Sequence, residues 1–291
     1  MKRARINLII SMAAFGTIGL FVKNIELSSA KIALFRSVLA FLLIGIYFLF
    51  SKKKIYFSKI KKELLLLLVS GAAMGFNWIF LFEAYNYTTV SVATLSYYFA
   101  PIIVTVICPV IFREKMRLKD WVCFFGSTLG IILITGIGDF NEGADHLKGI
   151  FLGLSAAVLY ATVIIINKCI KNVEGTERTL FQFFSAAVVL TPYIAFTEGF
   201  AGISLDMKGW FCLLAVGIIH SGVCYILYFS SLGKLSGQKV ALLSYIDPLV
   251  AVLCSAFILN EKMTAIQIVG GVLILGFTLY NEIAKKEGKN K

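Results

Sequence analysis

The segments Tyr98-Phe99-Ala100-Pro101 and Glu114-Lys115-Met116 recur further along the chain as Tyr245-Ile246-Asp247-Pro248 and Glu261-Lys262-Met263. The second copy of every shared position lies 147 residues after the first, as in the shift from Tyr98 to Tyr245. Both copies lie in strongly apolar stretches of the sequence. The repeat therefore predicts a chain that is built from two related membrane units.

The composition is typical of a protein that crosses a membrane several times. Of the 291 residues, 59% are hydrophobic and only 15% are charged, whereas about a quarter of the residues of a soluble domain are charged. Apolar runs of about 20 residues, each long enough to cross the bilayer core as a helix, recur along the chain. We therefore predict an all-α membrane protein with ten transmembrane helices, at residues 6–22, 30–50, 63–84, 91–112, 120–138, 147–167, 177–197, 209–231, 237–259 and 264–282.

The placement of the positive charge predicts the orientation of the chain. A net charge of +12 would also suit a nucleic-acid-binding protein, but the basic residues gather in alternate connections and near both ends, at residues 2–5, 52–62, 113–119, 168–178, 234–239 and 285–291. The opposite connections are poor in Lys and Arg and contain acids such as Asp139, Glu142 and Glu198. Cytoplasmic loops carry such a basic excess. We therefore expect both termini in the cytoplasm and a multi-pass protein of the plasma or inner membrane, with the lipid bilayer and not nucleic acid as its partner.

Further matches extend the repeat over the whole chain. Phe15 corresponds to Tyr160 and Trp78 to Tyr225, with offsets of 145 and 147 residues. Each unit contains five expected spans, an odd number, so the second copy must enter the membrane from the opposite side. Inverted repeats of this kind can exchange conformations and expose a midplane site to each side in turn. The two predicted repeats cover residues 1–140 and 147–291.

Two five-helix repeats, each with a proline inside a span and a short Glu-Lys loop after it, resemble the EamA-like ten-helix exporters of the drug/metabolite transporter superfamily. Pro101 with Pro248 and Glu114 with Glu261 carry most of the resemblance, and Arg36 also fits the pattern of the first repeat. The resemblance implies a central cavity with the fifth and tenth spans at the periphery. It also implies the export of amino acids, related metabolites or toxic compounds.

Two ionisable residues near the expected middle of the membrane are candidates for coupling transport to protons. Asp247 lies beside Pro248 within an apolar span, where an ionisable group is costly and marks a functional site by default. His220 lies midway along another span, and the ordinary pKa of histidine suits a proton carrier. The alternative for Asp247 is a structural cap of a broken helix, and the alternative for His220 is a packing and hydrogen-bonding role.

The candidate substrate-binding residues are mostly aromatic and fall on the spans that the resemblance places around the cavity. They are Phe15, Asn77, Trp78, Tyr98, Tyr160, Tyr225 and Tyr245. Such residues would form a largely apolar pocket with a few hydroxyl groups and one amide, which suits amphiphilic metabolites and hydrophobic amino acids. The alternative is that many of these rings only pack against other helices or face lipid.

Four further residues are predicted to act as a gate or in a structural role. Pro101 and Pro248 are expected hinges, since proline removes a helix hydrogen bond. Glu83 is either an outer gate or a side chain that reaches the interface. Arg36 either pairs with Glu83 or a substrate carboxylate, or reaches the outer interface. Its counterpart in the second repeat is Gln182, so a symmetric role is not expected.

The glycines of the fifth and tenth spans, Gly126, Gly130, Gly270, Gly271 and Gly276, permit close helix contacts. If these spans are peripheral, the same faces could form a homodimer. A P-loop, a metal-ligand cluster and a catalytic constellation are all missing from the sequence, so we expect neither an enzyme nor a cofactor.

The sequence favours a secondary active transporter, an exporter of amino acids or small amphiphilic metabolites and drugs, that works by proton-coupled alternating access. The alternatives are a facilitated exchanger of metabolites and an intramembrane lipid-linked transferase. A transferase would be expected to hold metal-bound phosphates with acidic clusters in its cytoplasmic loops, but these loops are rich in lysine. The sequence does not identify the substrate, the direction of transport, the coupling ion or the oligomeric state.

Overall fold

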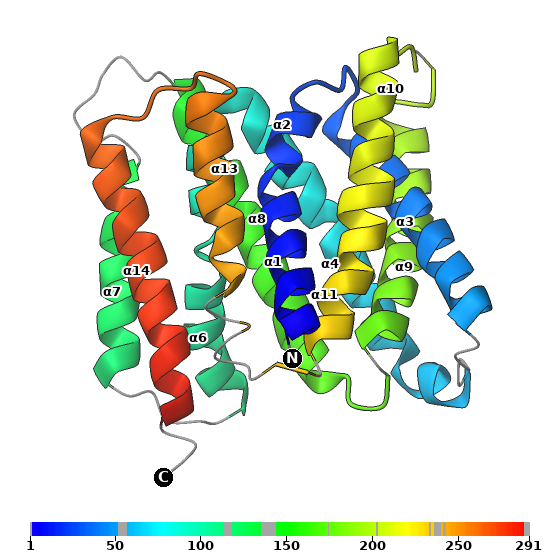
Figure 1. Cartoon of the computed structure of the whole chain (residues 1–291), viewed down its shortest axis with the longest axis horizontal. Helices are drawn as coiled ribbons and strands as arrows, with labels where there is room; N and C mark the ends of the chain where they lie inside the picture. Colours follow the sequence, from blue (N-terminus) through cyan, green and yellow to red (C-terminus); the bar gives the residue numbers. More distant parts are fainter. Residues whose placement is uncertain are drawn as a thin grey trace.

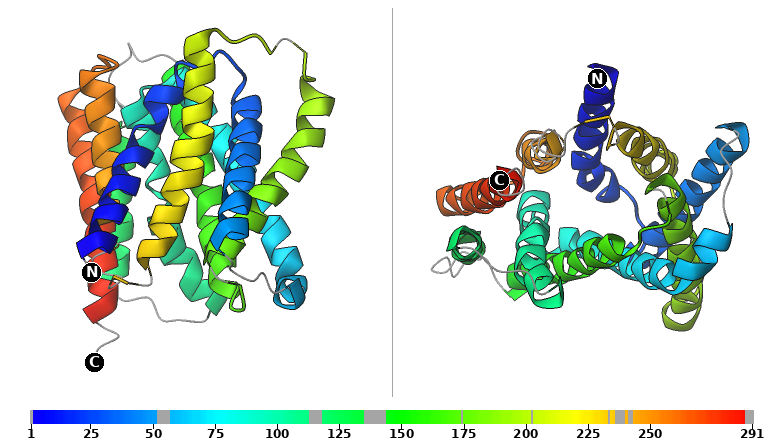
Figure 2. Two further views of the ribbon diagram at one scale, coloured as in Figure 1. Left: turned by 45° about the vertical axis from the view of Figure 1, so that its right-hand side comes forward. Right: turned by 90° about the horizontal axis from the view of Figure 1, so that it is seen from below.

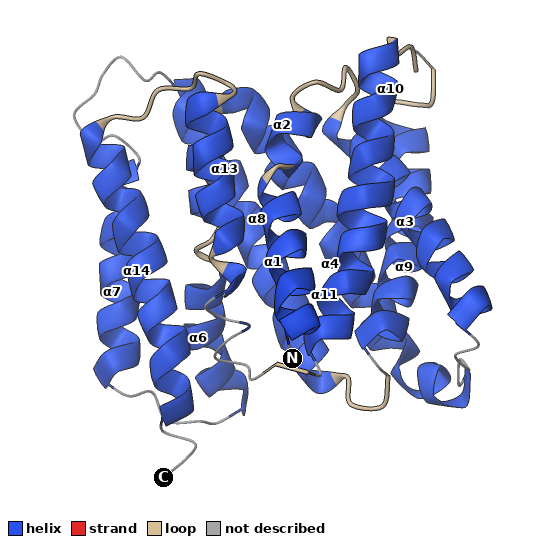
Figure 3. Cartoon of the chain, in the orientation of Figure 1, coloured by secondary structure: helices blue, strands red, loops and turns tan. Residues whose placement is uncertain are grey.

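The computed structural model describes the chain as a bundle of helices. It covers residues 2–51, 57–112, 118–134, 144–173, 175–201, 203–232, 234–235, 240 and 243–287. All regular structure within these ranges is helical (Figure 3). The helices lie side by side, and α1 begins at the same end of the bundle at which α14 ends (Figure 1).

The helices of the first half are α1 (Lys2–Gly16), α2 (Ile18–Val22), α3 (Ser29–Ser51), α4 (Phe57–Tyr87), α5 (Val90–Tyr97), α6 (Ala100–Phe112) and α7 (Leu118–Ile134). Those described in the second half are α8 (Ala144–Cys169), α9 (Gly175–Thr197), α10 (Met207–Leu214), the π-helix η1 (Ala215–Val223), α11 (Cys224–Leu232), α13 (Ile246–Phe257) and α14 (Ala265–Glu287). Each of the expected spans overlaps at least one of these helices.

Seven helical segments in the described ranges are long and apolar enough to cross a membrane. They are Lys2–Val22, Ser29–Ser51, Ile60–Tyr87, Val90–Ile111, Asp145–Cys169, Gly175–Thr197 and Met207–Ser231. Two apolar helices, Ile246–Phe257 and Ala265–Asn281, are shorter. An all-helical protein with several membrane spans is therefore confirmed, while the count of ten spans and the inverted relation of the halves stay predictions.

Both copies of the Tyr-x-x-Pro motif lie where a helix is interrupted. Tyr98 and Phe99 form a turn between α5 and α6, and Tyr245 lies directly before α13. Pro101 and Pro248 fall in the first turns of α6 and α13, where a missing N–H costs nothing because the first turn of a helix has no intrahelical acceptor for it. The prolines therefore begin new helices instead of kinking continuous ones.

The two halves pack against each other along most of their helices. Helix α4 of the first half packs on α8 and α9 of the second half, and α3 packs on α9 and η1. The helix α1 lies between α11 and α13, while α7 and α14 lie together at one edge of the bundle (Figure 2). A large apolar core fills the space between α3, α4, α9 and η1 and includes the buried side chains Trp78, Phe82 and Phe183. The candidate site described below lies at this contact between the two halves.

Four of the five glycines that motivated the expected homodimer pack within one chain, whereas a Cβ on Gly276 would meet nothing within 4 Å. A Cβ atom on Gly130 would lie 2.7 Å from the Gly270 carbonyl oxygen, and one on Gly270 would lie 2.6 Å from the Gly130 carbonyl oxygen. Gly126 faces Phe277 and Gly271 faces Leu95. These faces join α7 to α14 and α14 to α5, so a homodimer through spans 5 and 10 stays a prediction without their support.

Candidate functional site

Arg36 is a buried cation at the contact between α3 and the π-helix. Its Nε donates a 2.5 Å hydrogen bond to Ser221 Oγ, and its guanidinium carbon lies 4.3 Å from the centroid of the Trp78 ring and 5.7 Å from that of Phe82. The face of an aromatic ring attracts a cation. In the described part of the chain Arg36 forms no ion pair with Glu83; Glu83 instead accepts hydrogen bonds from Ser29 and from its helix neighbour Asn86.

The π-helix explains how His220 and Ser221 come to lie at the site. The His220 ring Nδ1 is 2.9 Å from the Ala215 carbonyl oxygen, and Ser221 Oγ donates to the Val216 carbonyl oxygen at 2.8 Å. Both bonds reach back five residues, a spacing that matches the wider turn of a π-helix. Such turns are rare and occur frequently at functional sites.

His220 contacts the break in the first span and not Asp247. Its Nε2 is 2.9 Å from the hydroxyl of Thr17, the residue between α1 and α2. The Thr17 hydroxyl also lies 2.7 Å from the Ala14 carbonyl oxygen, and the ring of Phe21 packs edge-on against the imidazole. Among the described residues, His220 therefore bonds to Thr17 and to the Ala215 carbonyl oxygen, and Asp247 bonds to Tyr98.

Asp247 lies in the first turn of α13 and accepts a 2.7 Å hydrogen bond from the Tyr98 hydroxyl. The bond joins the two copies of the repeated motif. The start of a helix is a favourable place for a negative charge, because the unpaired N–H groups make it partly positive. A Cβ atom added to Gly16 would overlap the Asp247 carbonyl oxygen. The breaks in the first, fourth and ninth expected spans thus meet around Asp247.

Five of the six predicted aromatic residues fall into two groups of packed rings. In one, Phe183 stacks on Trp78 and packs against Tyr225, which in turn packs against Phe15, with ring centroids between 5.2 and 5.3 Å apart. In the other, Tyr97 packs against Tyr98 at 6.1 Å and against Tyr160 at 5.2 Å. Arg36 lies on the first group and Asp247 beside the second. The side chains beside the two charged groups are thus mostly aromatic, and the set contains one group of each charge.

The remaining predicted residues have different surroundings. The Asn77 side-chain amide donates a 2.6 Å hydrogen bond to the Ala156 carbonyl oxygen and so joins α4 to α8. Glu83 lies near the end of α4, with Ser29 of α3 as its partner at 2.7 Å. Tyr245 lies at the interruption before α13. Of the repeated Glu-Lys motif, residues 114–116 lie outside the described ranges.

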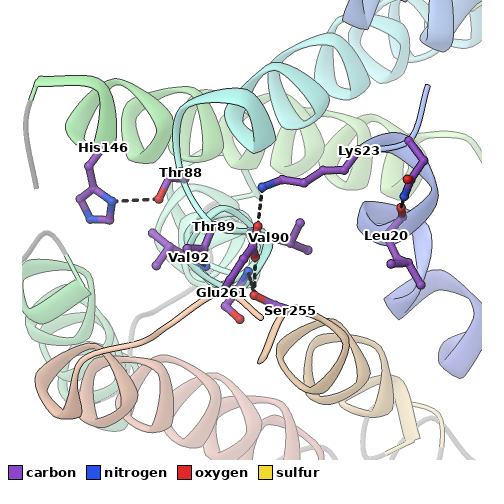
Figure 4. Close-up of polar contacts among 11 residues, drawn as sticks. Leu20, Lys23, Thr88, Thr89, Val90, Val92, His146, Ser255 and Glu261 are labelled. Carbon is purple, nitrogen blue, oxygen red and sulfur yellow. Dashed lines mark hydrogen bonds and ion pairs between the residues drawn. The ribbon is translucent and has the colours of Figure 1, made fainter. Parts of the chain in front are cut away.

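A second polar cluster, which we call the Glu261 clamp, joins three elements (Figure 4). Glu261 forms an ion pair with Lys23, which follows α2. It also accepts hydrogen bonds from the Val90 backbone N–H at 2.8 Å and from the Ser255 hydroxyl at 2.5 Å. Val90 is the first residue of α5, so the carboxylate caps that helix. The clamp therefore joins the end of α2, the start of α5 and the last turn of α13.

Sequence reasoning missed several members of these clusters. Thr17, Tyr97, Phe183 and Ser221 are not charged and lie in ordinary apolar runs, so their roles depend on contacts with distant helices. Glu261 did carry a signal, since it belongs to the repeated motif that carried the resemblance. Its partnership with Lys23 could not be inferred, because the two residues lie 238 positions apart.

Comparison with known proteins agrees with this architecture. The model of the EamA-like transporter family matches the chain twice, at residues 3–136 and 147–281. The "Uncharacterized transporter YxxF" of Bacillus subtilis is 30% identical over 98% of this chain and 91% of its own length. The "Probable amino-acid metabolite efflux pump" of Salmonella typhimurium is 26% identical over 57% of this chain and 58% of its own.

A crystal structure with 14% sequence identity matches 94% of this chain and 95% of its own with a TM-score of 0.66, which shows a shared fold. The "Uncharacterized inner membrane transporter YhbE" of Escherichia coli is 30% identical over 44% of this chain and 40% of its own length. The matches to the family model together span almost the whole chain. The protein therefore belongs to the EamA-like transporter family and is an integral membrane protein.

Proposed function

We propose that the protein is a secondary active exporter of amino acids or small amphiphilic metabolites in the plasma or inner membrane, coupled to protons and working by alternating access. The observation that carries the proposal is the meeting of helix breaks from both halves around Asp247. In transporters built from inverted repeats, such breaks free polar groups for a substrate near the middle of the membrane. The energy source is proposed to be a proton gradient because the sequence contains no ATP-binding motif.

The contacts between helices support two repeats related by a two-fold axis. A two-fold axis would relate span 1 to span 6, span 2 to span 7 and so on, so every contact between two spans should have a counterpart. The counterpart of the contact between α4 and α8 is the contact of η1 and α11 with α1. The counterpart of the contact between α4 and α9 is the contact between η1 and α3. The counterpart of the contacts of α5 and α6 with α8 is the contact between α13 and α1. All these contacts occur. The proposal therefore takes residues 1–140 and 147–291 as inverted five-span units with both termini in the cytoplasm.

The hydrogen bonds around His220 support a proton-binding role. Three contacts run in series, from Ala14 to Thr17, from Thr17 to His220 and from His220 to Ala215. Carbonyl oxygens at both ends can only accept, and the Thr17 hydroxyl has a single hydrogen. A neutral imidazole carries one N–H, so the Thr17 hydroxyl and the neutral ring together offer two hydrogens for three hydrogen bonds. A protonated ring carries two N–H groups, so all three hydrogen bonds can form at once only when His220 is charged.

The neighbourhood of Asp247 supports the coupling of protons to the moving helices. Asp247 receives its hydrogen bond from the break between α5 and α6, and its backbone touches Gly16, which directly precedes Thr17. Gain or loss of a proton at Asp247 or His220 therefore changes polar contacts where α1, α5 and α13 meet. A facilitated exchanger would keep the same binding groups without this dependence on a proton gradient.

Proteoliposomes test the proposal. Purified protein is reconstituted, and the uptake of labelled L-phenylalanine, L-leucine and L-methionine is followed with and without an imposed pH gradient. An interior more acidic than the medium should drive accumulation through wild-type protein. Asp247→Asn and His220→Gln should both accumulate at least tenfold less, and His220→Gln should still exchange labelled for unlabelled substrate.

The same assay separates the alternatives. Accumulation that ignores the pH gradient, with exchange intact, indicates a facilitated exchanger. Gradient-driven accumulation that persists in both Asp247→Asn and His220→Gln removes these residues from the coupling. Tyr193→Phe, which removes the hydroxyl of a partly exposed ring of α9, is the matched control and should transport as wild type does.

A further inference from the structure

The start of α5 takes two of its hydrogen-bond acceptors from the second half of the chain (Figure 4). The first N–H groups of a helix have no acceptor within it. One of them bonds to the side chain of the cap residue Thr89. The N–H of Val90 bonds instead to Glu261 at 2.8 Å, and the N–H of Ser91 bonds to the Ser255 hydroxyl at 3.3 Å. These two donors therefore depend on a contact between the halves.

The turn after α13 fixes both acceptors to that helix. Asn260 has a φ of 54°, in the left-handed region that asparagine adopts more readily than most residues. The turn brings the Glu261 N–H back to the Ser255 carbonyl oxygen at 3.0 Å. The Ser255 hydroxyl in turn donates to the Glu261 carboxylate at 2.5 Å. The two side chains that cap α5 thus form one unit with the end of α13.

The helix α2 closes on the same place. A Cβ atom on Gly19 of α2 would lie 2.4 Å from Val90 Cγ1, and Val90 is fully buried. Lys23, which follows α2, forms the ion pair with Glu261. The elements α2, α5 and α13 therefore meet at the end of the bundle opposite both termini, the upper end in Figure 1.

The contact between α5 and α13 runs from this end to the candidate site. The two helices pack against each other and are bonded at both ends of α5, by Ser91 with Ser255 and by Tyr98 with Asp247. At the upper end the bonding groups are two backbone N–H groups, a hydroxyl, a carboxylate and an ammonium group. Water can serve all of these groups when they separate. The upper contact can therefore open without breaking a hydrogen bond within α5.

From these contacts we propose that the Glu261 clamp is a gate. Glu261 and Ser255 release the start of α5 when the upper end opens and bind it again when that end closes. The structure holds the closed form. With both termini in the cytoplasm, this end faces outward, so the clamp closes the outer side of the site. The gate rests on the proposed function for its place in a transport cycle, and Glu261 and Ser255 act in it through α5.

A disulfide across the gate tests the proposal. In Gly19→Cys/Val90→Cys, the Cβ of residue 19 would lie 3.4 Å from that of residue 90, near the roughly 3.5–4.5 Å of a disulfide. The oxidised variant should exchange labelled L-phenylalanine in proteoliposomes at least about tenfold more slowly than its reduced form, because the closed end cannot open. A reductant should restore exchange.

Two controls accompany the linked protein. Wild-type protein with its native cysteines is treated with the same oxidant and should keep its exchange. Gly153→Cys/Ser96→Cys joins α8 to α5 on one side of the gate, with the Cβ of residue 153 placed 3.0 Å from that of Ser96. This variant should also exchange L-phenylalanine when oxidised.

A second measurement needs no transport. Opening of the gate exposes α2, whose backbone forms no bond to Glu261 in the described part of the chain. The amides of α2 should therefore exchange hydrogen about threefold or more faster in Glu261→Ala than in wild-type protein, since loss of the clamp populates the open form. Lys262→Ala, at an exposed position in the same connection, should exchange as wild type does. Loss of the cap alone would quicken exchange in α5 and leave α2 unchanged.

The outcomes separate the gate from the proposed function. Exchange of L-phenylalanine that persists in the disulfide-linked protein overturns the gate and leaves the transport proposal standing. Unchanged hydrogen exchange of α2 in Glu261→Ala also overturns the gate, even if the cysteine variant fails to fold. If α2 responds as expected but wild-type liposomes show no exchange, the clamp stands as a conformational switch and the transport proposal fails.

Discussion

The Tyr98 hydroxyl is the contact by which the first copy of the motif holds the carboxylate of the second. Tyr98→Phe removes that hydroxyl and leaves the ring. A hydrogen bond to a charged group contributes about 1.5–3 kcal/mol, so substrate binding that uses Asp247 should change at least tenfold. The measurement is the dissociation constant of L-phenylalanine for Tyr98→Phe, with Tyr193→Phe as control. An unchanged constant would show that the hydroxyl does not orient the carboxylate.

Thr17 offers a second test at the level of one atom. Thr17→Val keeps the shape of the side chain but leaves the His220 ring without its Nε2 partner. A buried polar group left unpaired costs about 1–3 kcal/mol, so the melting temperature should fall by several degrees. Thr162 occupies the corresponding place in the second repeat, and within the described ranges its hydroxyl bonds only to the Val158 carbonyl of its own helix. Thr162→Val should therefore melt as wild type does, and an equal loss in both variants would contradict the role given to Thr17.

At the residue scale, the sequence identifies charges better than it identifies their partners. Arg36, His220 and Asp247 stand out because an ionisable group is rare within an apolar span. Their contacts to Ser221, Thr17 and Tyr98 cross 149 to 203 positions of sequence. Such contacts depend on how helices pack, which a single sequence with local periodicity does not specify.

The close approach of α1 to α13 is a property of two helices and depends on one glycine. In Gly16→Ala the new Cβ would overlap the Asp247 carbonyl oxygen and lie 2.7 Å from Val250 Cβ. Overpacking of this kind costs about 1–3 kcal/mol, and the two helices must separate at the site. We expect a lower melting temperature together with weaker L-phenylalanine binding.

Gly45→Ala is the matched control for this substitution, because a Cβ at Gly45 in α3 meets nothing within 4 Å. It should leave binding unchanged and stability unchanged or slightly raised, since alanine favours helix more than glycine does. Full binding by Gly16→Ala would show that the approach of α1 to α13 does not shape the site.

The Glu261 clamp is the polar fastening between elements at the upper end. Glu261→Ala leaves the Val90 N–H and the Ser255 hydroxyl without their acceptor, and the free energy of unfolding should fall by about 1–3 kcal/mol. Glu26→Ala, at an exposed position in the connection after α2, should change it by less than about 0.5 kcal/mol. The free energy of unfolding of both variants is measured by the same detergent titration. Equal values for Glu261→Ala and Glu26→Ala would show that the Glu261 clamp does not stabilise the fold.

Elements were predictable to different degrees. The apolar runs and the proline motifs predicted where helices lie and where they are interrupted, because both follow from local chemistry. The π-helix at Ala215–Val223 was not predicted, since its sequence is an ordinary apolar run and the extra residue per turn is stabilised by the contacts that His220 and Ser221 make with other helices. The break at Thr17 was missed for the same reason.

For the whole molecule, the duplication supplies the frame and the differences between its copies supply the chemistry. Arg36 faces the site from the first half where the second has Gln182, a residue that here bonds to Ser70 and Asn167. Asp247 precedes Pro248 where Ala100 precedes Pro101. Each half thus contributes one charge that the other lacks, and the account requires both halves to hold a substrate between them.

Counterflow in proteoliposomes tests this central claim most directly. Vesicles preloaded with unlabelled L-phenylalanine are diluted into labelled L-phenylalanine without any ion gradient. We predict a transient accumulation of label through wild-type protein, because a carrier exchanges one molecule for another across the membrane. This accumulation should be lost in the Arg36→Gln/Asp247→Asn variant. Entry of label at the same rate as in protein-free vesicles would contradict the account.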